Sequence, residues 1–406
     1  MDGDPAVEPE LDSFSLTFPC RIVSPSSSFS VAVWAWGANL HYLYLVKVDV
    51  PALIRYPGRT SPHHPPHHLS TYRLATILSL VYAFSLLVFW VFTRRDPAAV
   101  LRWDWLPLTY LVVLIGVFLA PLQNLSNAGR GRFLTTLKRV SVGSIAEAKD
   151  GKFGDILLAD VLTSYARVFG DLYVAMCMFF RTDGSATARP DRNCGGAFFV
   201  PLVMAVPSLI RLRQCLIEYG RVARGPQTAA TGWGGQHLAN ALKYFTAFPV
   251  ITLAALQRNL GPSPGLYRAW FCACLVNSLY SFYWDVAKDW DLTLFNNTHQ
   301  RNAPDQPFGL RRRLVVGPPA LYYAVIALDL TLRCTWTLKM SAHLDHISDF
   351  ESSLFVIEFL EVLRRWIWIF FRVETEWIRN QVTLGVAPDD ILLGDYHFKD
   401  DDEDDD

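Results

Sequence analysis

Long apolar stretches recur along this chain, and they constrain its fold more than any other feature. A helix needs about 20 mostly apolar residues to cross the hydrocarbon core of a bilayer. Hydrophobic residues make up 51% of the chain and charged residues 18%, less than the roughly one quarter typical of soluble domains. The sequence therefore predicts an all-α, polytopic membrane protein. The clear candidate spans are residues 29–48, 74–93, 105–122, 156–180, 196–212, 238–256, 266–284, 320–340 and 354–371.

A tenth segment, residues 132–144, is short and basic, so it is either an amphipathic surface helix or a marginal tenth span. Loop charges bear on this choice, because Lys and Arg are enriched in cytosolic loops. With ten spans the basic loops all fall on one side, whereas with nine the later loops switch to the side opposite Arg94. The pattern favours about ten transmembrane helices, with both termini cytosolic. The loop residues are Arg94, Arg95, Arg102, Lys149, Lys152, Arg211, Arg213, Arg221, Arg224, Arg301, Arg311, Arg312 and Arg313.

Motifs for catalysis are absent from the sequence. There is no G-x-x-x-x-G-K-[ST] nucleotide loop, no G-x-S-x-G elbow and no H-E-x-x-H zinc motif. The seven Cys residues show no spacing typical of a zinc site or a disulfide framework, so we interpret them as small buried apolar residues. A net charge of −1 argues against nucleic-acid binding. We therefore predict no enzyme activity, no cofactor and no metal site.

Ionisable residues lie inside several predicted spans, where lipid makes them costly unless they have partners or face a water-filled cavity. The segment NSLYSFYWDVAKDWDLTLF (277–295) places Asp285 and Asp289 four residues apart, and hence on one helix face, among aromatic residues. Lys243 and Tyr244 lie in another span. The remaining candidates are two predicted pairs at i and i+4, Asp329–Arg333 and Glu361–Arg365, together with Asp160, Trp336 and Arg364.

These intramembrane charges have a structural and a functional interpretation. In the first, ion pairs within and between helices lock the bundle together. In the second, cations from separate helices and the carboxylates facing them line a polar tunnel for an anion. Arginine suits phosphate because its planar fork offers paired donors. Carboxylates keep the binding weak enough for release. The number of such residues favours the functional interpretation.

Five stretches of the chain resemble the EXS domain, a family that includes the phosphate exporters of animals and plants. They are YWDVAKDWDLTLF (283–295), LYYAVIALDLTLRCTWTLKMS (321–341), FLEVLRRWIWIFFRVETEWIRN (359–380), PSLIRLRQCLIEYGRV (207–222) and LANALKYF (238–245). The resemblance implies an EXS-type helical bundle that carries inorganic phosphate across the lipid bilayer. It implies phosphate binding by Lys243, Tyr244, Arg333, Trp336, Arg364 and Arg365, and pathway carboxylates at Asp160, Asp285 and Asp289.

Two features differ from the full-length exporters. Thr163 stands where those proteins have Asn, and about 28 residues precede the first span, which leaves no counterpart of their cytosolic SPX sensor. The short form resembles the yeast ER-retention-defective (Erd) branch of the family. We therefore expect a flexible cytosolic N-terminus (1–28), N-terminal scaffold helices (29–150), an EXS transport domain (151–385) and an acidic cytosolic tail (386–406).

The Erd resemblance implies a multi-pass Golgi membrane protein that cycles with the ER. We predict that it moves phosphate from the Golgi lumen to the cytosol, which supports glycosylation and retention of Golgi and ER residents. The alternative is a non-transporting membrane adaptor for retrograde sorting, with glycosyltransferases or vesicle-coat factors as partners. Deleting residues 396–406 separates the two, because the adaptor would lose retention with phosphate flux intact. A homodimer is implied by the resemblance alone.

Overall fold

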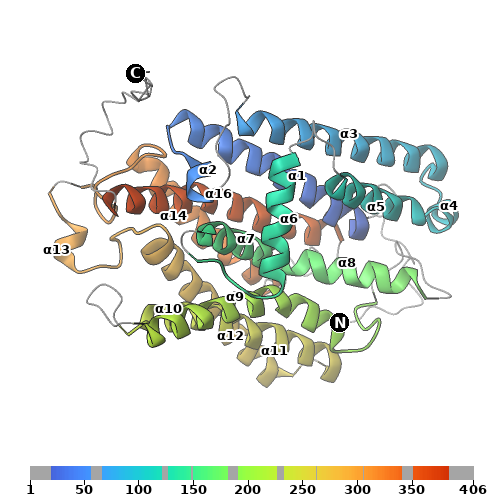
Figure 1. Cartoon of the computed structure of the whole chain (residues 1–406). Coiled ribbons are helices and arrows are strands. Elements are labelled where there is room, and N and C mark those ends of the chain that lie inside the picture. Colours follow the sequence, from blue (N-terminus) through green and yellow to red (C-terminus); the bar gives the residue numbers. More distant parts are fainter. Residues whose placement is uncertain are drawn as a thin grey trace, which may run out of the picture.

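The computed structural model describes residues 20–55, 66–120, 127–147, 150–181, 191–225, 233–261, 263–304, 306–340 and 351–383. Within these ranges the regular structure is entirely helical, without strands. Figure 1 shows the long helices packed side by side in one bundle, which confirms the predicted fold class. The helices are α1 (Cys20–Leu45), α2 (Val50–Leu53), α3 (His67–Thr93), α4 (Pro97–Arg102), α5 (Trp105–Leu119), α6 (Asn127–Ser141), α7 (Lys152–Ser164), α8 (Ala166–Phe179), α9 (Phe199–Arg224), α10 (Gly235–Phe245), α11 (Ala247–Leu260), α12 (Pro264–Trp284), a π-helical turn (Asp285–Asp289), α13 (Thr298–Arg301), α14 (Pro319–Arg333), a 3₁₀ turn (Thr335–Met340) and α16 (Glu351–Thr383).

The bundle has two ends that differ in chemistry. One, here called the basic end, is formed by α2, the start of α7 and the loop 290–318. These segments share a hydrophobic cluster that includes Leu43 and Trp290. The other, here called the disulfide end, is formed by the last turn of α8 and the turn after it, where Cys177 and Cys194 are bonded. Figure 1 shows α2 and α13 at the left of the bundle, with α4 and the end of α8 at the right.

The helix α6, which covers the predicted marginal span, does not run from one end of the bundle to the other. Arg132 donates to the carbonyl of Ile54 at 3.2 Å, and Arg139 pairs with Asp155 in the first turn of α7, so both anchors lie at the basic end. Figure 1 shows α6 crossing the direction of the long helices. Arg130 explains the position, because it donates to carbonyls at the C-terminal end of α5, a role that requires the basic helix to fold back against α5.

The basic loops consequently do not all lie at one end of the bundle, whereas the sequence had predicted one side for all of them with ten spans. Arg94, Arg95 and Arg102 lie at the disulfide end, since α5 begins there with Leu108 packed against Ala175 of α8. The later basic loops lie at the basic end. The first residue of α1 and the last residue of α16 also lie at opposite ends, whereas both termini were predicted on one side; residues 1–19 and 384–406 themselves lie outside the described residues.

Three of the helical segments are long and apolar enough to cross a membrane by length and composition alone. These are His67–Thr93, Phe199–Arg224 and the α10–α11 segment Gly235–Leu260, while α5 is apolar but shorter. Their apolar side chains face outward, as lipid contact requires; Phe84 of α3, for example, is 68% exposed. The result is a membrane bundle whose polar groups face inward.

Two predicted spans are interrupted in the middle of the bundle. The segment 238–256 breaks at Thr246 between α10 and α11, because Pro249 cannot donate to the carbonyl four residues earlier and its ring crowds that carbonyl. The segment 156–180 breaks at Tyr165 between α7 and α8, just after Thr163 turns its hydroxyl back onto the carbonyl of Asp160 at 2.7 Å. Discontinuous helices at mid-membrane are typical of transporter binding sites.

The prediction that all cysteines are small buried apolar residues was wrong in part. Cys177 and Cys194 form a disulfide, and Cys272 is exposed. Cys215 and Cys274 are buried, as predicted. The disulfide joins a helix end to a residue 17 positions later, a spacing that matches no motif.

Candidate functional site

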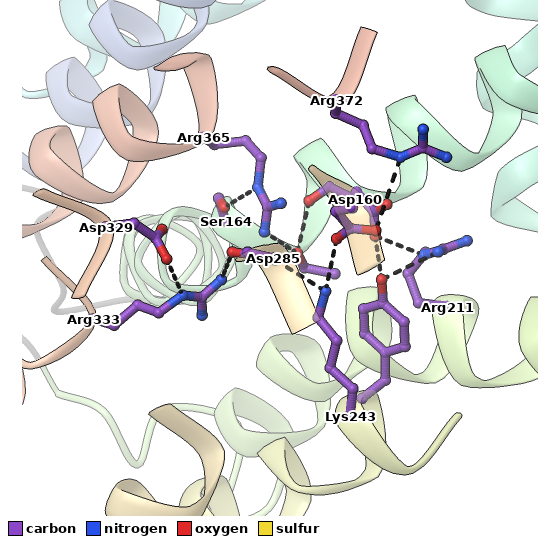
Figure 2. Close-up of polar contacts among 12 residues, drawn as sticks. Asp160, Ser164, Arg211, Lys243, Asp285, Asp329, Arg333, Arg365 and Arg372 are labelled. Atoms are coloured by element: carbon purple, nitrogen blue, oxygen red, sulfur yellow. Dashed lines mark hydrogen bonds and ion pairs between the residues drawn. The ribbon is translucent and has the colours of Figure 1, made fainter. Parts of the chain in front are cut away.

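Charged and polar side chains from α7, α9, α10, α14, α16 and the π-helical turn meet in the interior of the bundle (Figure 2). We call this set the central charge cluster. Most of its members are buried, and each helix contributes side chains that point toward the others. Its members are Asp160, Arg211, Lys243, Asp285, Asp289, Asp329, Arg333, Glu361, Arg364, Arg365 and Arg372.

The π-helical turn places two carboxylates around one lysine. Its defining bond runs from Trp290 N–H to the carbonyl of Asp285, five residues back, at 2.8 Å. Lys243 Nζ lies 3.3 Å from Asp285 Oδ1 and 3.3 Å from Asp289 Oδ2. The sequence predicted both carboxylates on one face of a regular helix. The wider turn changes that spacing, and π-helical turns of this kind occur often at functional sites.

Arg333 and Arg364 share carboxylates on the far side of Asp285. Arg333 donates to Asp285 and, through Nε at 3.0 Å, to Asp329. Arg364 Nη1 lies 3.0 Å from Asp329 and 3.5 Å from Asp285. The predicted i, i+4 pair of Asp329 with Arg333 is confirmed. Both arginines bridge Asp285 and Asp329, which makes this part of the cluster a continuous ladder that begins at Lys243.

Arg365 follows Arg364 in the sequence but has different partners. Its Nε donates to Ser164 at 2.9 Å and its Nη2 to Thr163 at 3.3 Å, so the hydroxyl that stands in place of the family's amide does make a contact. Its Nη1 is buried without a hydrogen-bond partner in the described part of the chain. The predicted pair of Glu361 with Arg365 was wrong. Glu361 pairs with Arg364 at 2.6 Å, because Arg365 turns toward α7.

Asp160 is held by two donors. Arg211 Nε donates to its Oδ1 at 2.7 Å and the Tyr244 hydroxyl at 2.5 Å, while Arg211 also donates to Tyr244 at 3.1 Å. Arg211 is 3% exposed, whereas the sequence analysis placed it in a basic loop. The loop begins later because α9 continues past this residue. A signal was present, since Arg211, Gln214 and Glu218 recur at helical spacing and so share one face of α9.

Trp336 lies beside the central charge cluster and not within it. Its Nε1 donates to Ser278 Oγ at 2.9 Å, and that hydroxyl donates to the carbonyl of Arg333 at 3.0 Å. The indole packs edge-on against Trp270 and Phe271. The structure therefore brings the other predicted site residues together, and the hydrogen bonds of the described residues connect Trp336 to them through Ser278.

A cavity of about 670 Å³ lies at the basic end and reaches the central charge cluster. Its inner wall includes Arg211, Asp289 and Arg372. Arg372 was not identified from the sequence; it lies 3.8 Å from Asp289 and 3.0 Å from Glu376. The available signal was its position seven residues after Arg365, on the same face of α16 two turns later. Further basic residues on the wall are Arg55, Lys152, Lys288 and Arg379.

The cluster is close to neutral. Its six cations face six carboxylates once Glu376 is counted. An anion arriving from the cavity must therefore replace a carboxylate as the partner of Arg or Lys. Arg365 is the exception, because its partners are hydroxyls. Within the described residues, no three His, Cys, Asp or Glu side chains are grouped so that they could hold a metal ion.

Comparison with known proteins gives one family. The profile described as "EXS family" matches residues 20–378. Protein ERD1 homolog 1 of Schizosaccharomyces pombe is 30% identical over 352 residues, which cover 85% of this chain and 87% of that protein. Protein ERD1 of Kluyveromyces lactis is 31% identical over 290 residues, covering 68% of this chain and 71% of its own length.

A further relative is longer than this chain. Solute carrier family 53 member 1 of Mus musculus is 27% identical over 338 residues, which are 79% of this chain but 45% of that protein. The EXS match and the solute-carrier relatives indicate a transporter or another membrane protein and not an enzyme.

Proposed function

Because the chain belongs to the EXS family, we propose that it transports inorganic phosphate across the Golgi membrane, from the lumen to the cytosol. In this proposal residues 151–385 form the transport domain and residues 29–150 a scaffold. The observation that carries it is the cavity of about 670 Å³ at the basic end, which ends on the central charge cluster. The phosphate-binding residues are Lys243, Tyr244, Arg333, Trp336, Arg364 and Arg365.

The contacts within the cluster define an order of binding steps. Arg211 and Arg372 meet the anion first, because they line the cavity. Lys243 comes next, since it contacts Asp289 at the cavity wall and the fully buried Asp285 behind it. In each step a phosphate oxygen replaces a carboxylate oxygen as the partner of a cation. Such exchange keeps binding firm enough for entry and weak enough for exit.

Arg365 is the main phosphate-binding residue in this proposal. Its free Nη1 gives phosphate a donor without first breaking an ion pair. Its guanidinium carbon also lies 4.6 Å from the ring centroid of Trp368, which keeps the fork in a fixed plane. The neighbouring Arg364 would join as phosphate displaces Asp329, giving the bidentate contacts that favour arginine over lysine.

The ladder of Arg333 with Asp285 and Asp329 closes the route toward the disulfide end. Neither Arg333 nor Trp336 lines the cavity at the basic end. Transport therefore requires Asp285 to release Arg333. The interrupted helices α7–α8 and α10–α11 carry Asp160 and Lys243. Their breaks supply the hinges for a conformational change that separates Asp285 from Arg333.

The two ends support an orientation of the chain in the membrane. Disulfides persist in oxidising compartments, which favours a lumenal position for the end with Cys177 and Cys194. The basic end then faces the cytosol, in keeping with its later basic loops, whereas Arg94, Arg95 and Arg102 lie at the other end. The Golgi assignment rests on the resemblance to the Erd branch, and its check is co-localisation of the tagged full chain with Golgi rather than ER or plasma-membrane markers.

Phosphate flux through the purified full chain tests the proposal. We expect radiolabelled phosphate to exchange across proteoliposomes that contain the protein. Arg365→Gln should lower this flux about tenfold or more, since hydrogen bonds to charged groups contribute roughly 1.5–3 kcal/mol. The variant should still fold, because Arg365 leaves only hydroxyls behind. Arg268→Gln, which removes an exposed cation of α12, is the matched control and should transport normally. Unchanged flux in Arg365→Gln would remove the assigned site.

The adaptor alternative uses the basic loops or the tail 386–406, and the tail lies outside the described residues. Deleting 396–406 remains the direct comparison, with enzyme retention and phosphate flux measured in the same cells. Lost retention with normal flux would show that the tail acts separately from the central charge cluster.

A further inference from the structure

A second cavity lies between the N-terminal helices and the rest of the bundle, apart from the cavity at the basic end. It measures about 280 Å³ and is bordered by α1, α3, α5, α6, α7 and α16. We propose that it binds one anionic phospholipid from the leaflet at the basic end, with the phosphate at Arg132 and an acyl chain between the helices. In the proposed transport cycle phosphate enters through the other cavity, and this one meets the route only at Arg365.

The walls of this second cavity suit an acyl chain. They are mostly aliphatic and aromatic, and an apolar cavity of this kind excludes water while it accepts apolar ligands. In a membrane protein the abundant apolar ligand is the lipid chain itself. The wall residues include Val33, Leu74, Leu157, Val161 and Ile369.

Arg132 supplies the charge that a phospholipid headgroup needs. Its Nη2 donates to the carbonyl oxygens of Ile54 and Asp150, each at 3.2 Å, and neither oxygen carries a formal charge. No carboxylate of the described residues pairs with Arg132. Two turns later on α6, Arg139 pairs with Asp155 and is neutralised. The positive charge at Arg132 is therefore left for an anion from outside the chain, and a phosphate matches the guanidinium fork.

The direction of the cavity agrees with the orientation of a lipid in that leaflet. Arg132, Ile54 and Gly154 border it near the basic end, where the headgroup layer lies. Phe29 and Val362 border it deeper, near the middle of the bundle. The charged group is thus at the membrane surface and the apolar walls extend inward, as the headgroup and chain of a phospholipid do.

The deep wall also touches the proposed transport route. Arg365 and Trp366 border the cavity, and each has a buried N–H without a partner in the described part of the chain. A lipid chain at this position would exclude water from the side of Arg365. The lipid would then complete the wall of the pathway, which the protein alone leaves open toward α1 and α6.

Lipid binding to the purified full chain tests this proposal without depending on transport. The protein is delipidated, phosphatidylserine or phosphatidylcholine is added back, and bound lipid is counted by native mass spectrometry. We expect one tightly bound phosphatidylserine per chain. Arg132→Gln should weaken that binding about tenfold, in line with the loss of a hydrogen bond to a charged group.

Two further variants keep the result interpretable. Gly154→Leu fills the cavity; its Cβ would meet Ile54 at 3.6 Å, an ordinary contact, so folding should survive while lipid is excluded. Lys138→Gln removes an exposed charge from the same helix without touching the cavity and should leave binding unchanged. Three results would each overturn the proposal. They are equal losses of lipid binding in Lys138→Gln and Arg132→Gln, normal lipid binding in Gly154→Leu, and equal binding of both lipids. Thermal melting of each variant identifies one that has not folded, and Gly154→Leu then decides.

Discussion

The central charge cluster has an open half and a sealed half built from the same residue types. The open half borders the cavity at the basic end, and there Arg372 stands 3.8 Å from Asp289. In the sealed half, Arg333 and Arg364 each bridge two carboxylates, with contacts to Asp329 of 3.0 Å. The open half consists of Arg211, Asp289 and Arg372, with Asp160 buried behind Arg211, and the sealed half of Asp285, Asp329, Arg333 and Arg364.

The two halves contain the same residue types, so access to the cavity, and not composition, distinguishes residues that bind the anion from residues that close the route. A cation that borders a water-filled cavity can change its partner at low cost, because water screens and replaces what is lost. A buried cation between two carboxylates cannot, since removing one partner leaves an uncompensated charge. We therefore assign capture of the anion to the open half and closure of the route to the sealed half. The following substitutions test that assignment.

The largest effect is expected at Asp285, where Lys243, Arg333 and Arg364 converge on a carboxylate with no exposed surface. Asp285→Asn should reduce the free energy of unfolding by about 3–5 kcal/mol, the usual cost of breaking a buried ion pair. Thermal or denaturant unfolding in detergent measures it. Asp289→Asn is the comparison and should cost much less, because Asp289 borders the cavity. Equal losses would mean that the two halves do not differ in access.

A smaller effect is expected at Arg372, whose removal should change phosphate capture more than stability. Arg372→Gln should raise the phosphate concentration for half-maximal flux about tenfold, as expected for one charged hydrogen-bond donor. The melting temperature should change little, because water from the cavity can solvate Asp289 and Glu376. A variant with unchanged phosphate dependence but slower maximal flux would instead place Arg372 in the gate.

The smallest effect is expected at Lys288, an exposed residue on the wall of the same cavity. Lys288→Ala should raise the half-maximal phosphate concentration about twofold, since it acts through the local potential and not through a direct bond. Raising the ionic strength from about 0.1 M to about 1 M should abolish the difference between variant and wild type, because the screening length falls from about 10 Å to about 3 Å. A salt-independent effect would show a direct contact with the anion.

Much of the candidate site could be predicted, because intramembrane charge is rare enough to be informative. Lys243, Asp285, Arg333 and Arg364 were selected from the sequence, and the structure brings them into contact. Arg211 was missed since a basic residue near the end of an apolar stretch looks like the start of a loop. Its helical spacing with Gln214 was the better guide.

The partners of each charge could not be predicted in the same way. Glu361 and Arg365 have ideal i, i+4 spacing, yet Arg365 contacts Thr163 and Ser164 of another helix. Intrahelical spacing gives only the pairs that are possible, and neighbouring helices compete for the same donors. The disulfide of Cys177 with Cys194 shows the same limitation, because the spacing of the two residues matches no motif.

The sequence by itself determined the all-helical membrane fold, since apolar length and the need to satisfy backbone hydrogen bonds in lipid leave few other solutions. It also determined most of the residues that carry charge into the bundle, although Arg211 and Arg372 were missed. Only the tertiary structure decided that α6 lies across the long helices, and which half of the cluster borders the cavity. Both depend on packing between helices. The interhelical hydrogen bonds, ion pairs and cavities are set by distances between helices, and these cannot be read from one helix alone.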